Sequence, residues 1–194
     1  EEETFSVTIL HTNDTHSHHE PNAAGDGGAA RQAAVVNQIR AEGGNVLLLD
    51  GGDRFTGTLF HQQYRGQDSV QIMNAIGYDA MTLGNHEFDK GMAEIQRIQN
   101  GGCHADGCTP NRPFTGAKFK YLSANVVAKG TKNPLFPAYL TAVASARRLL
   151  GRFRCRRRGA SFFLFFLVPR GGPRRRRPRH GELNRWHSPP RTYR

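Results

Sequence analysis

Residues 46–53 read Val-Leu-Leu-Leu-Asp-Gly-Gly-Asp, an apolar run that stops at an aspartate, two glycines and a second aspartate. Four consecutive apolar residues without alternation predict a strand that is buried on both faces, as in a parallel sheet. The two glycines allow the backbone to turn sharply and bring Asp53 close to a metal ion or a phosphate. This stretch therefore predicts an α/β fold with a polar site where the strand ends.

Strand-like and helix-like segments alternate around this run. Residues 5–11 are rich in β-branched and apolar side chains and predict a first strand. The same reasoning predicts later strands at residues 78–83 and 121–127. Apolar residues at helical spacing, followed by glycine, predict helices over residues 29–42, 68–76 and 92–99. This order is typical of an α/β layered fold, in which ligand-binding groups gather on loops at the carboxyl ends of the strands.

Charge divides the chain into two parts. Residues 1–146 hold 11 basic and 15 acidic side chains, a net charge of −4, whereas residues 147–194 hold 16 Arg and one acid, a net charge of +15. The total of +11 is therefore a property of the second part, and we expect the first part not to bind nucleic acid. We expect residues 147–194 to be an Arg-rich tail, disordered or mistranslated, because a nucleic-acid-binding arm normally mixes Arg with Lys.

Polar clusters follow the first three predicted strands. In an extended chain, Asp14 and His16 point to the same side and can hold one cation. The carboxylate of Asp53 has two oxygens and can bridge two cations that are roughly 3.5–4 Å apart. Each of these residues alone is more often a turn or cap residue, but three clusters in this order favour a shared site.

The third cluster follows Gly84. The amide oxygen of Asn85 is a neutral metal ligand. If the chain turns helically here, His86 and Asp89 lie on the same face, and the carboxylate of Asp89 can orient the imidazole. We expect Asp50, by contrast, to be a turn residue rather than a ligand.

The clusters and their flanks resemble the opening motifs of the 5′-nucleotidase family, within the calcineurin-like metallophosphoesterases. The motifs are ILHTNDTHS at 9–17, LLDGGD at 48–53, NAIGYDAM at 74–81, LGNHEFD at 83–89 and LSAN at 122–125. The resemblance covers about residues 5–140. It implies an incomplete four-layer α/β sandwich, in which residues 1–146 are the N-terminal part of the catalytic domain.

The resemblance also implies a site with two divalent metal ions, zinc or else manganese, cobalt or magnesium. The implied ligands are Asp14 and His16 for the first ion, Asp53 for both ions, and Asn85 for the second ion. His86 and Asp89 would form the catalytic pair that stabilises the transition state, and Asn85 and His86 would contact the substrate. Such ions lower the pKa of a bound water from 15.7 to about 7.

The implied reaction converts a nucleoside 5′-monophosphate into a nucleoside and phosphate. The implied partner is therefore a nucleotide substrate. The implied location is extracellular or at the cell surface, with membrane association only through segments outside this sequence. No apolar run reaches the roughly 18–20 residues that a membrane-spanning helix needs.

The family completes its metal site with two later histidine motifs, one of the type Gly-His-x-His, and adds a domain that binds the base. The only histidines of the sequence after Leu140 are His180 and His187, and neither lies in such a motif. We therefore expect this chain, as written, to have little or no hydrolase activity. The alternatives are a non-catalytic fragment that binds metal or phosphate, and a basic protein that binds nucleic acid or membranes through residues 147–194.

Two smaller features complete these expectations. Cys103 and Cys108 can close a small disulfide loop in an oxidising compartment. Four further histidines are expected at strand ends or on the surface rather than as ligands: His11, His18, His19 and His61.

Overall fold

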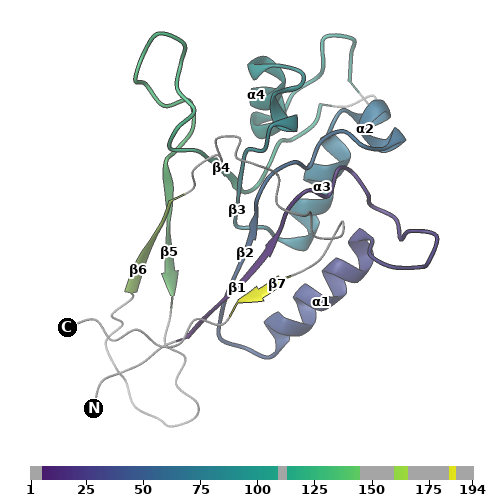
Figure 1. The fold of residues 1–194 in the computed structure, drawn as a ribbon, viewed down its shortest axis with the longest axis vertical. Coiled ribbons are helices and arrows are strands. Elements are labelled where there is room, and N and C mark those ends of the chain that lie inside the picture. The colour runs from purple at the N-terminus through teal and green to yellow at the C-terminus, as the bar shows by residue number, and fades with distance from the viewer. Residues whose placement is uncertain (1–5, 109–112, 145–159, 166–183, 187–194) are drawn as a thin grey trace, which may run out of the picture.

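A computed structural model describes residues 6–108, 113–144, 160–165 and 184–186 (Figure 1). Its central sheet has the order β4-β3-β2-β1-β7, in which the first four strands are parallel and β7 is antiparallel to β1. These strands are β1 (Val7–Thr12), β2 (Asn45–Asp50), β3 (Ala80–Thr82), β4 (Lys120–Leu122) and β7 (Asn184–Trp186). The parallel sheet confirms the expectation from the apolar run at residues 46–49.

Helices connect the parallel strands, as the sequence predicts. They are α1 (Ala29–Ala41), α2 (Leu59–Tyr64), α3 (Gln67–Ile76), the 3-10 helix η1 (His86–Phe88) and α4 (Met92–Asn100). The three predicted helices correspond to α1, α3 and α4. The sequence does not predict α2, which is too short to show a helical apolar period, whereas η1 is the helical turn on which the pairing of His86 and Asp89 depends.

Successive side chains along the strands point to opposite faces of the sheet, and this divides the core into two clusters. Leu48 and Met81 are buried on one face of the sheet in the same core cluster as Val36 of α1 and Met73 of α3. Their neighbours in sequence are buried on the other face, in a smaller cluster made by Leu49, Ala80 and Leu122, with Ile9 and Leu140 packed against it. The strands β2 and β3 therefore have two buried faces, as expected in a parallel sheet.

Leu140 belongs to a second, two-stranded sheet. This sheet pairs β5 (Tyr139–Ala144) with β6 (Ala160–Phe165) in antiparallel orientation. Figure 1 shows the pair on the side of the central sheet opposite the helices. The described residues thus hold a helical layer, the parallel sheet and part of a second sheet, in agreement with the expected α/β sandwich.

The strand predicted at residues 121–127 is wrong beyond Leu122. The hydroxyl of Ser123 donates to the side chain of Asn125 at 3.1 Å, and the backbone N–H of Val126 donates to the same hydroxyl at 3.3 Å. These local bonds give the backbone an alternative to pairing in the sheet. The strand therefore ends after three residues.

Most of the tail at residues 147–194 lies outside the described residues. Within it, the structure describes β6 and β7, so the disordered or mistranslated tail stays a prediction. His180 and His187 lie outside the described residues as well. In the part of the chain that is described, no helix has the length and apolar character to cross a membrane.

Leu48 tests the central packing. It is fully buried in the middle of β2, so we expect Leu48→Ala to lower the free energy of unfolding by about 2–5 kcal/mol, through lost burial and the cavity left behind. The measurement is urea unfolding followed by circular dichroism. Leu59→Ala is the matched control, because Leu59 is 76% exposed and its truncation should cost less than about 0.5 kcal/mol. Equal losses in the two variants would contradict this account of the core.

Candidate functional site

The loops that follow β1 and β2 are hydrogen-bonded to each other beyond the ends of the strands. The backbone N–H of Asp14 donates to the carbonyl of Gly52 at 2.9 Å, and that of His16 donates to the carbonyl of Asp53 at 3.1 Å. This pairing continues the parallel alignment of β1 and β2 into the loops. It brings the first two polar clusters of the sequence together.

Asp14, His16 and Asp53 form a potential metal-binding cluster. Each offers one ligand atom, and these atoms all lie within 4.8 Å of one another. Nε2 of His16 is 3.8 Å from Oδ1 of Asp14. Two carboxylates and an imidazole are suitable donors for zinc and similar divalent ions. The cluster therefore fits a divalent ion on the chemistry of its donors.

The backbone of this cluster is left-handed rather than extended. The φ angles are 51° at Asp14, 45° at His16 and 56° at Asp53, in a region that L-residues rarely adopt. The expectation that Asp14 and His16 converge because the chain is extended is therefore wrong. They converge because the loop curls back over the loop that follows β2. Strained backbone of this kind is found mainly at functional sites.

The loop that follows β3 lies directly against the same cluster. A side chain at Gly52 would collide with the backbone of Gly84, and a side chain at Gly84 would collide with the carboxylate of Asp53. The backbone N–H of His86 donates to Oδ1 of Asp53 at 2.9 Å. Glycine at these two positions thus lets the second and third clusters meet.

His86 and Asp89 form the pair that the sequence predicts. They lie three residues apart across η1, with Nδ1 of His86 2.7 Å from Oδ2 of Asp89. This hydrogen bond raises the pKa of His86 above its ordinary value, against a smaller opposing effect of burial. The ring of His86 is 5.0 Å from the ring of His16, which places the pair beside the metal-binding cluster.

Asn85 is exposed immediately before η1, next to His86 in the sequence. Its position puts it on the loop that approaches Asp53. Its assignment as a ligand of a second ion stays a prediction.

Glu87 is a central residue that the sequence reasoning missed. Its carboxylate is almost fully buried and accepts backbone N–H groups from Asp53 at 2.9 Å, Arg54 at 2.8 Å and Gly84 at 2.6 Å. Burial raises its pKa to about 7, although the three N–H donors favour the charged form. Glu87 therefore ties the loop after β2 to the loop after β3. Only its place inside the LGNHEFD motif marked it in the sequence.

Asp50 is a turn residue, as the sequence predicts, because its Oδ1 accepts from the backbone N–H of Gly52, two residues on, at 2.9 Å. It is fully buried at the end of β2, where Oδ2 accepts from Nε of Arg54 at 2.8 Å. Arg54 also donates to the hydroxyl of Thr12 at 2.8 Å. Burial alone would lower the pKa of Arg54, but Asp50 and then Tyr78 raise it above its ordinary value. This buried ion pair fixes the loop that carries Asp53.

Two further expectations have different outcomes. The disulfide between Cys103 and Cys108 is present. The surface position expected for His61 is wrong, because only 9% of this residue is exposed. Its ring packs in a tilted arrangement against Phe55, with the ring centres 5.4 Å apart.

Comparison with known proteins identifies the family. The family model described as calcineurin-like phosphoesterase matches residues 7–138, which include every residue of the cluster. The chain belongs to this family. Its fold and its polar loops are therefore those of a phosphoesterase domain.

Similar proteins of known sequence include 5′-nucleotidases. The chain is 42% identical to snake venom 5′-nucleotidase of Naja atra over 135 residues, which are 65% of this chain and 23% of that protein. It is 40% identical to 5′-nucleotidase of Homo sapiens over 136 residues, 65% of this chain and 21% of that one. It is 39% identical to protein UshA of Escherichia coli over 140 residues, which are 70% of this chain and 23% of that protein. The aligned part spans less than a quarter of each of these relatives.

Solved structures agree with this assignment. The 5′-nucleotidase precursor from Thermus thermophilus matches with a TM-score of 0.55 and 36% identity, over 71% of this chain and 26% of that one. The NAD nucleotidase of Haemophilus influenzae matches with a TM-score of 0.53 and 30% identity, over 70% and 26%.

Glu87→Gln tests whether the Glu87 carboxylate holds the loop after β2 and the loop after β3 together. The amide of glutamine has one acceptor oxygen, and its NH₂ group would face a backbone donor. We therefore expect the free energy of unfolding at pH 8 to fall by about 1–3 kcal/mol, as measured by urea unfolding. Glu20→Gln makes the same change at an exposed residue and should stay within about 0.5 kcal/mol of the wild type. An unchanged midpoint for Glu87→Gln would contradict the proposed tie.

Asp89→Asn tests the electrostatics of the histidine pair. The hydrogen bond from His86 raises the pKa of this imidazole by favouring its charged form. We expect the neutral amide of Asn to lower that pKa toward the ordinary value, so that His86 loses its proton at lower pH in an NMR titration. Asp106→Asn, which alters a carboxylate beside His104, is the control and should leave the titration of His86 unchanged. An identical His86 curve in Asp89→Asn would contradict this cause.

Proposed function

We propose that the chain carries part of the catalytic site of a metal-dependent phosphomonoesterase of the 5′-nucleotidase type, which converts nucleoside 5′-monophosphates into nucleoside and phosphate. The observation that carries the proposal is the meeting of Asp14, His16 and Asp53 within 4.8 Å beside the hydrogen-bonded pair of His86 and Asp89. The similarity to 5′-nucleotidases supports the substrate class.

In this proposal, Asp14, His16 and Asp53 hold the first of two divalent ions. Asp53 also contacts the second ion, together with Asn85. The ions supply activation of water and neutralisation of phosphoryl charge, which are the usual contributions of a two-metal site. The backbone N–H of His86 donates to one oxygen of the Asp53 carboxylate, and the backbone N–H of Asp53 donates to Glu87. These two hydrogen bonds position the carboxylate for this role.

His86 acts on the substrate side of the site. Because Asp89 accepts at Nδ1, the other ring nitrogen is left to donate a proton or a hydrogen bond to the phosphoryl or leaving-group oxygen. The hydrogen bond to Asp89 raises the pKa of His86 and so favours its protonated form, which suits the stabilisation of negative charge in the transition state. Asn85, on the same loop, is proposed to contact the substrate as well.

Two further parts of the proposal concern completeness and location. Asp53 and Asn85 are two ligands for the second ion, fewer than tight binding usually needs, so we propose little or no hydrolysis by the chain as written. We propose an extracellular or cell-surface location, which the disulfide and the similarity to venom enzymes support.

Metal binding tests the ligand assignment directly. Isothermal titration calorimetry with Zn²⁺ or Mn²⁺ should show binding to the full chain, and Asp53→Asn should weaken it at least tenfold because a charged ligand is lost. Asp26→Asn removes the same charge from an exposed residue of the first loop and should bind like the wild type. Equal affinity of Asp53→Asn and the wild type would overturn the assignment.

Hydrolysis of AMP tests the completeness of the site. With the metal that binds best, we expect release of phosphate to stay close to the rate without protein. A rapid rate that His86→Ala lowers by about 10²–10⁴-fold would contradict the proposed incompleteness while supporting the catalytic pair. A rapid rate that is insensitive to His86→Ala would overturn the role of the pair.

A further inference from the structure

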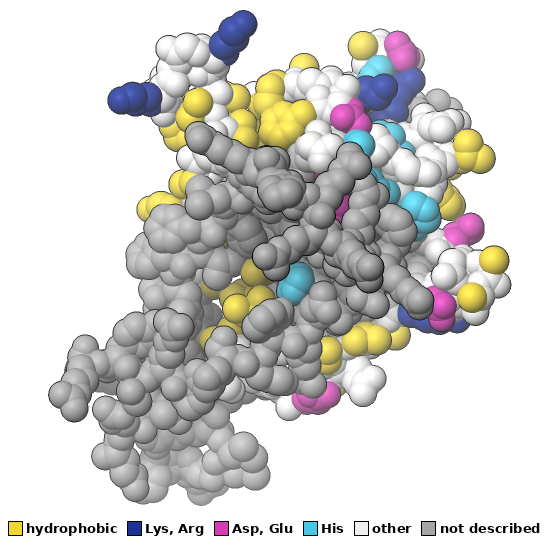
Figure 2. All heavy atoms as spheres, in the orientation of Figure 1, with side chains coloured by type: hydrophobic (Ala, Val, Ile, Leu, Met, Phe, Trp, Pro, Cys, Tyr) yellow, Lys and Arg dark blue, Asp and Glu magenta, His cyan; other side chains and the backbone are white. Residues whose placement is uncertain are grey.

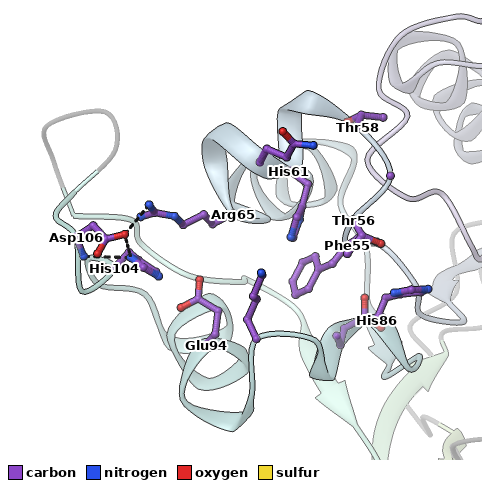
Figure 3. A pocket seen from close by; sticks show the side chains of 13 residues that line it. Phe55, Thr56, Thr58, His61, Arg65, His86, Glu94, His104 and Asp106 are labelled. Atoms are coloured by element: carbon purple, nitrogen blue, oxygen red, sulfur yellow. Dashed lines mark hydrogen bonds and ion pairs between the residues drawn. The ribbon is translucent and has the colours of Figure 1, made fainter.

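A cavity of about 550 Å³ opens beside His86 (Figure 3). Its walls come from the loop after β2, from α2, from η1 and α4, and from the disulfide-closed loop at residues 103–108. His86 lines this cavity and also lies 5.0 Å, ring to ring, from His16 of the metal-binding cluster. The cavity is therefore continuous with the site already described.

The acidic side chains of the wall all have partners within the protein. Glu87 accepts three backbone N–H groups, and the other two carboxylates pair with arginines. Asp106 forms an ion pair with Arg65 at 2.8 Å, and Figure 3 shows this pair at the far end of the cavity. Glu94 accepts from Nε of Arg97 at 2.8 Å and pairs with the same guanidinium through its other oxygen. Lys90 is exposed at the wall, and within the described ranges no acidic side chain forms an ion pair with it. It contributes a positive charge that a ligand can use.

His61 supplies the second polar group. Its Nδ1 is buried and lacks a hydrogen-bond partner among the described residues, which is costly unless something compensates it. Burial lowers the pKa of His61, so the imidazole is neutral near pH 7 and has a ring N–H to donate. Figure 3 shows its ring directed from α2 into the space between Phe55 and α4. Histidine gathers over this region, as Figure 2 shows around α2 and the neighbouring loops.

We propose that this cavity, which holds Lys90 and His61 in its wall and which we call the Lys90 pocket, is a second anion-binding subsite of the phosphoesterase centre. It would take a phosphoryl or carboxylate group that the substrate carries in addition to its scissile phosphate. Lys90 provides the charge, and His61 provides a directed hydrogen bond in a partly apolar wall. The inference rests on the proposed function, since His86 links the two sites.

The position of the pocket explains how selectivity arises. A substrate with a second anion engages the Lys90 pocket and the metal-binding cluster at once, and the second contact is then intramolecular and adds to the affinity. The disulfide loop forms the outer wall through His104 and Asp106, so it limits the size of the group that enters.

Phosphate binding without metal tests the Lys90 pocket alone. Inorganic phosphate is titrated into the metal-free full chain with a chelator present, and the His61 ring signals are followed by NMR. We expect saturable shifts in the wild type and in Asp53→Asn, and at least tenfold weaker binding in Lys90→Gln. Lys118→Gln removes the same charge from an exposed residue outside the cavity and should bind like the wild type.

The variants separate the possible failures. His61→Phe keeps a ring against Phe55 and should also weaken phosphate binding, with an unchanged circular dichroism spectrum. Binding to this variant is read from the ring signals of His86, which also lines the cavity. If the phosphate shifts persist with unchanged affinity in Lys90→Gln, the anion binds elsewhere and the pocket is not a subsite. An absence of shifts in the wild type overturns the inference too. Neither result bears on metal binding, which calorimetry with Zn²⁺ measures independently.

A substrate-like comparison distinguishes a substrate group from free phosphate. AMP and adenosine 3′,5′-bisphosphate are titrated into the metal-loaded chain. We expect the bisphosphate to bind at least fivefold tighter to the wild type, and the preference to disappear in Lys90→Gln. Equal binding of the two nucleotides by the wild type would overturn the role of the pocket in substrate selection.

Discussion

The arrangement of the site depends on one buried carboxylate. Glu87 accepts three backbone N–H groups from two different loops, and the carboxylate of Asp53 adds a further bond between them by accepting the backbone N–H of His86. The parallel sheet brings the strand ends into the same region, but it leaves the loops beyond them free to diverge. The carboxylate removes that freedom and holds Asp53 against Gly84. The cost of burying it is visible in its raised pKa.

A second group of buried polar contacts, at the ends of β1 and β2, supports the loops that Glu87 joins. Asp50 and Arg54 form a buried ion pair at the end of β2, and Thr12 at the end of β1 joins it. Such a pair adds little net stability, because desolvation of both charges offsets their attraction. Its value here is geometric, since it fixes the turn that gives Asp53 its left-handed backbone. The ligand geometry is thus maintained by polar contacts on top of an apolar core.

The sequence predicted the sheet and the polar clusters because both leave local patterns. An unbroken apolar run such as residues 46–49 indicates a strand buried on both faces, and the spacing of His86 and Asp89 indicates a shared helical face. The buried networks of Asp50 and Glu87 leave no such pattern, because they include partners far away along the chain. Thr12 is such a partner of Asp50, and the backbone of Asp53 is such a partner of Glu87. The burial of His61 is hidden for another reason, since α2 is too short to show a helical apolar period. A polar residue that turns the chain at the end of a strand looks the same in the sequence whether or not it also anchors a buried network.

Metal ligands and pocket walls come from different parts of the fold. The three residues of the metal-binding cluster lie on loops that are hydrogen-bonded to each other at the strand ends, where a change at one position disturbs the others. The Lys90 pocket is built partly by α2, α4 and the disulfide-closed loop, which contribute no residue to the cluster. Residues of these three segments can therefore vary without disturbing the proposed ligands. His86 and Glu87 line the pocket and also hydrogen-bond to Asp53, so in our proposal they couple the chemistry to the choice of substrate.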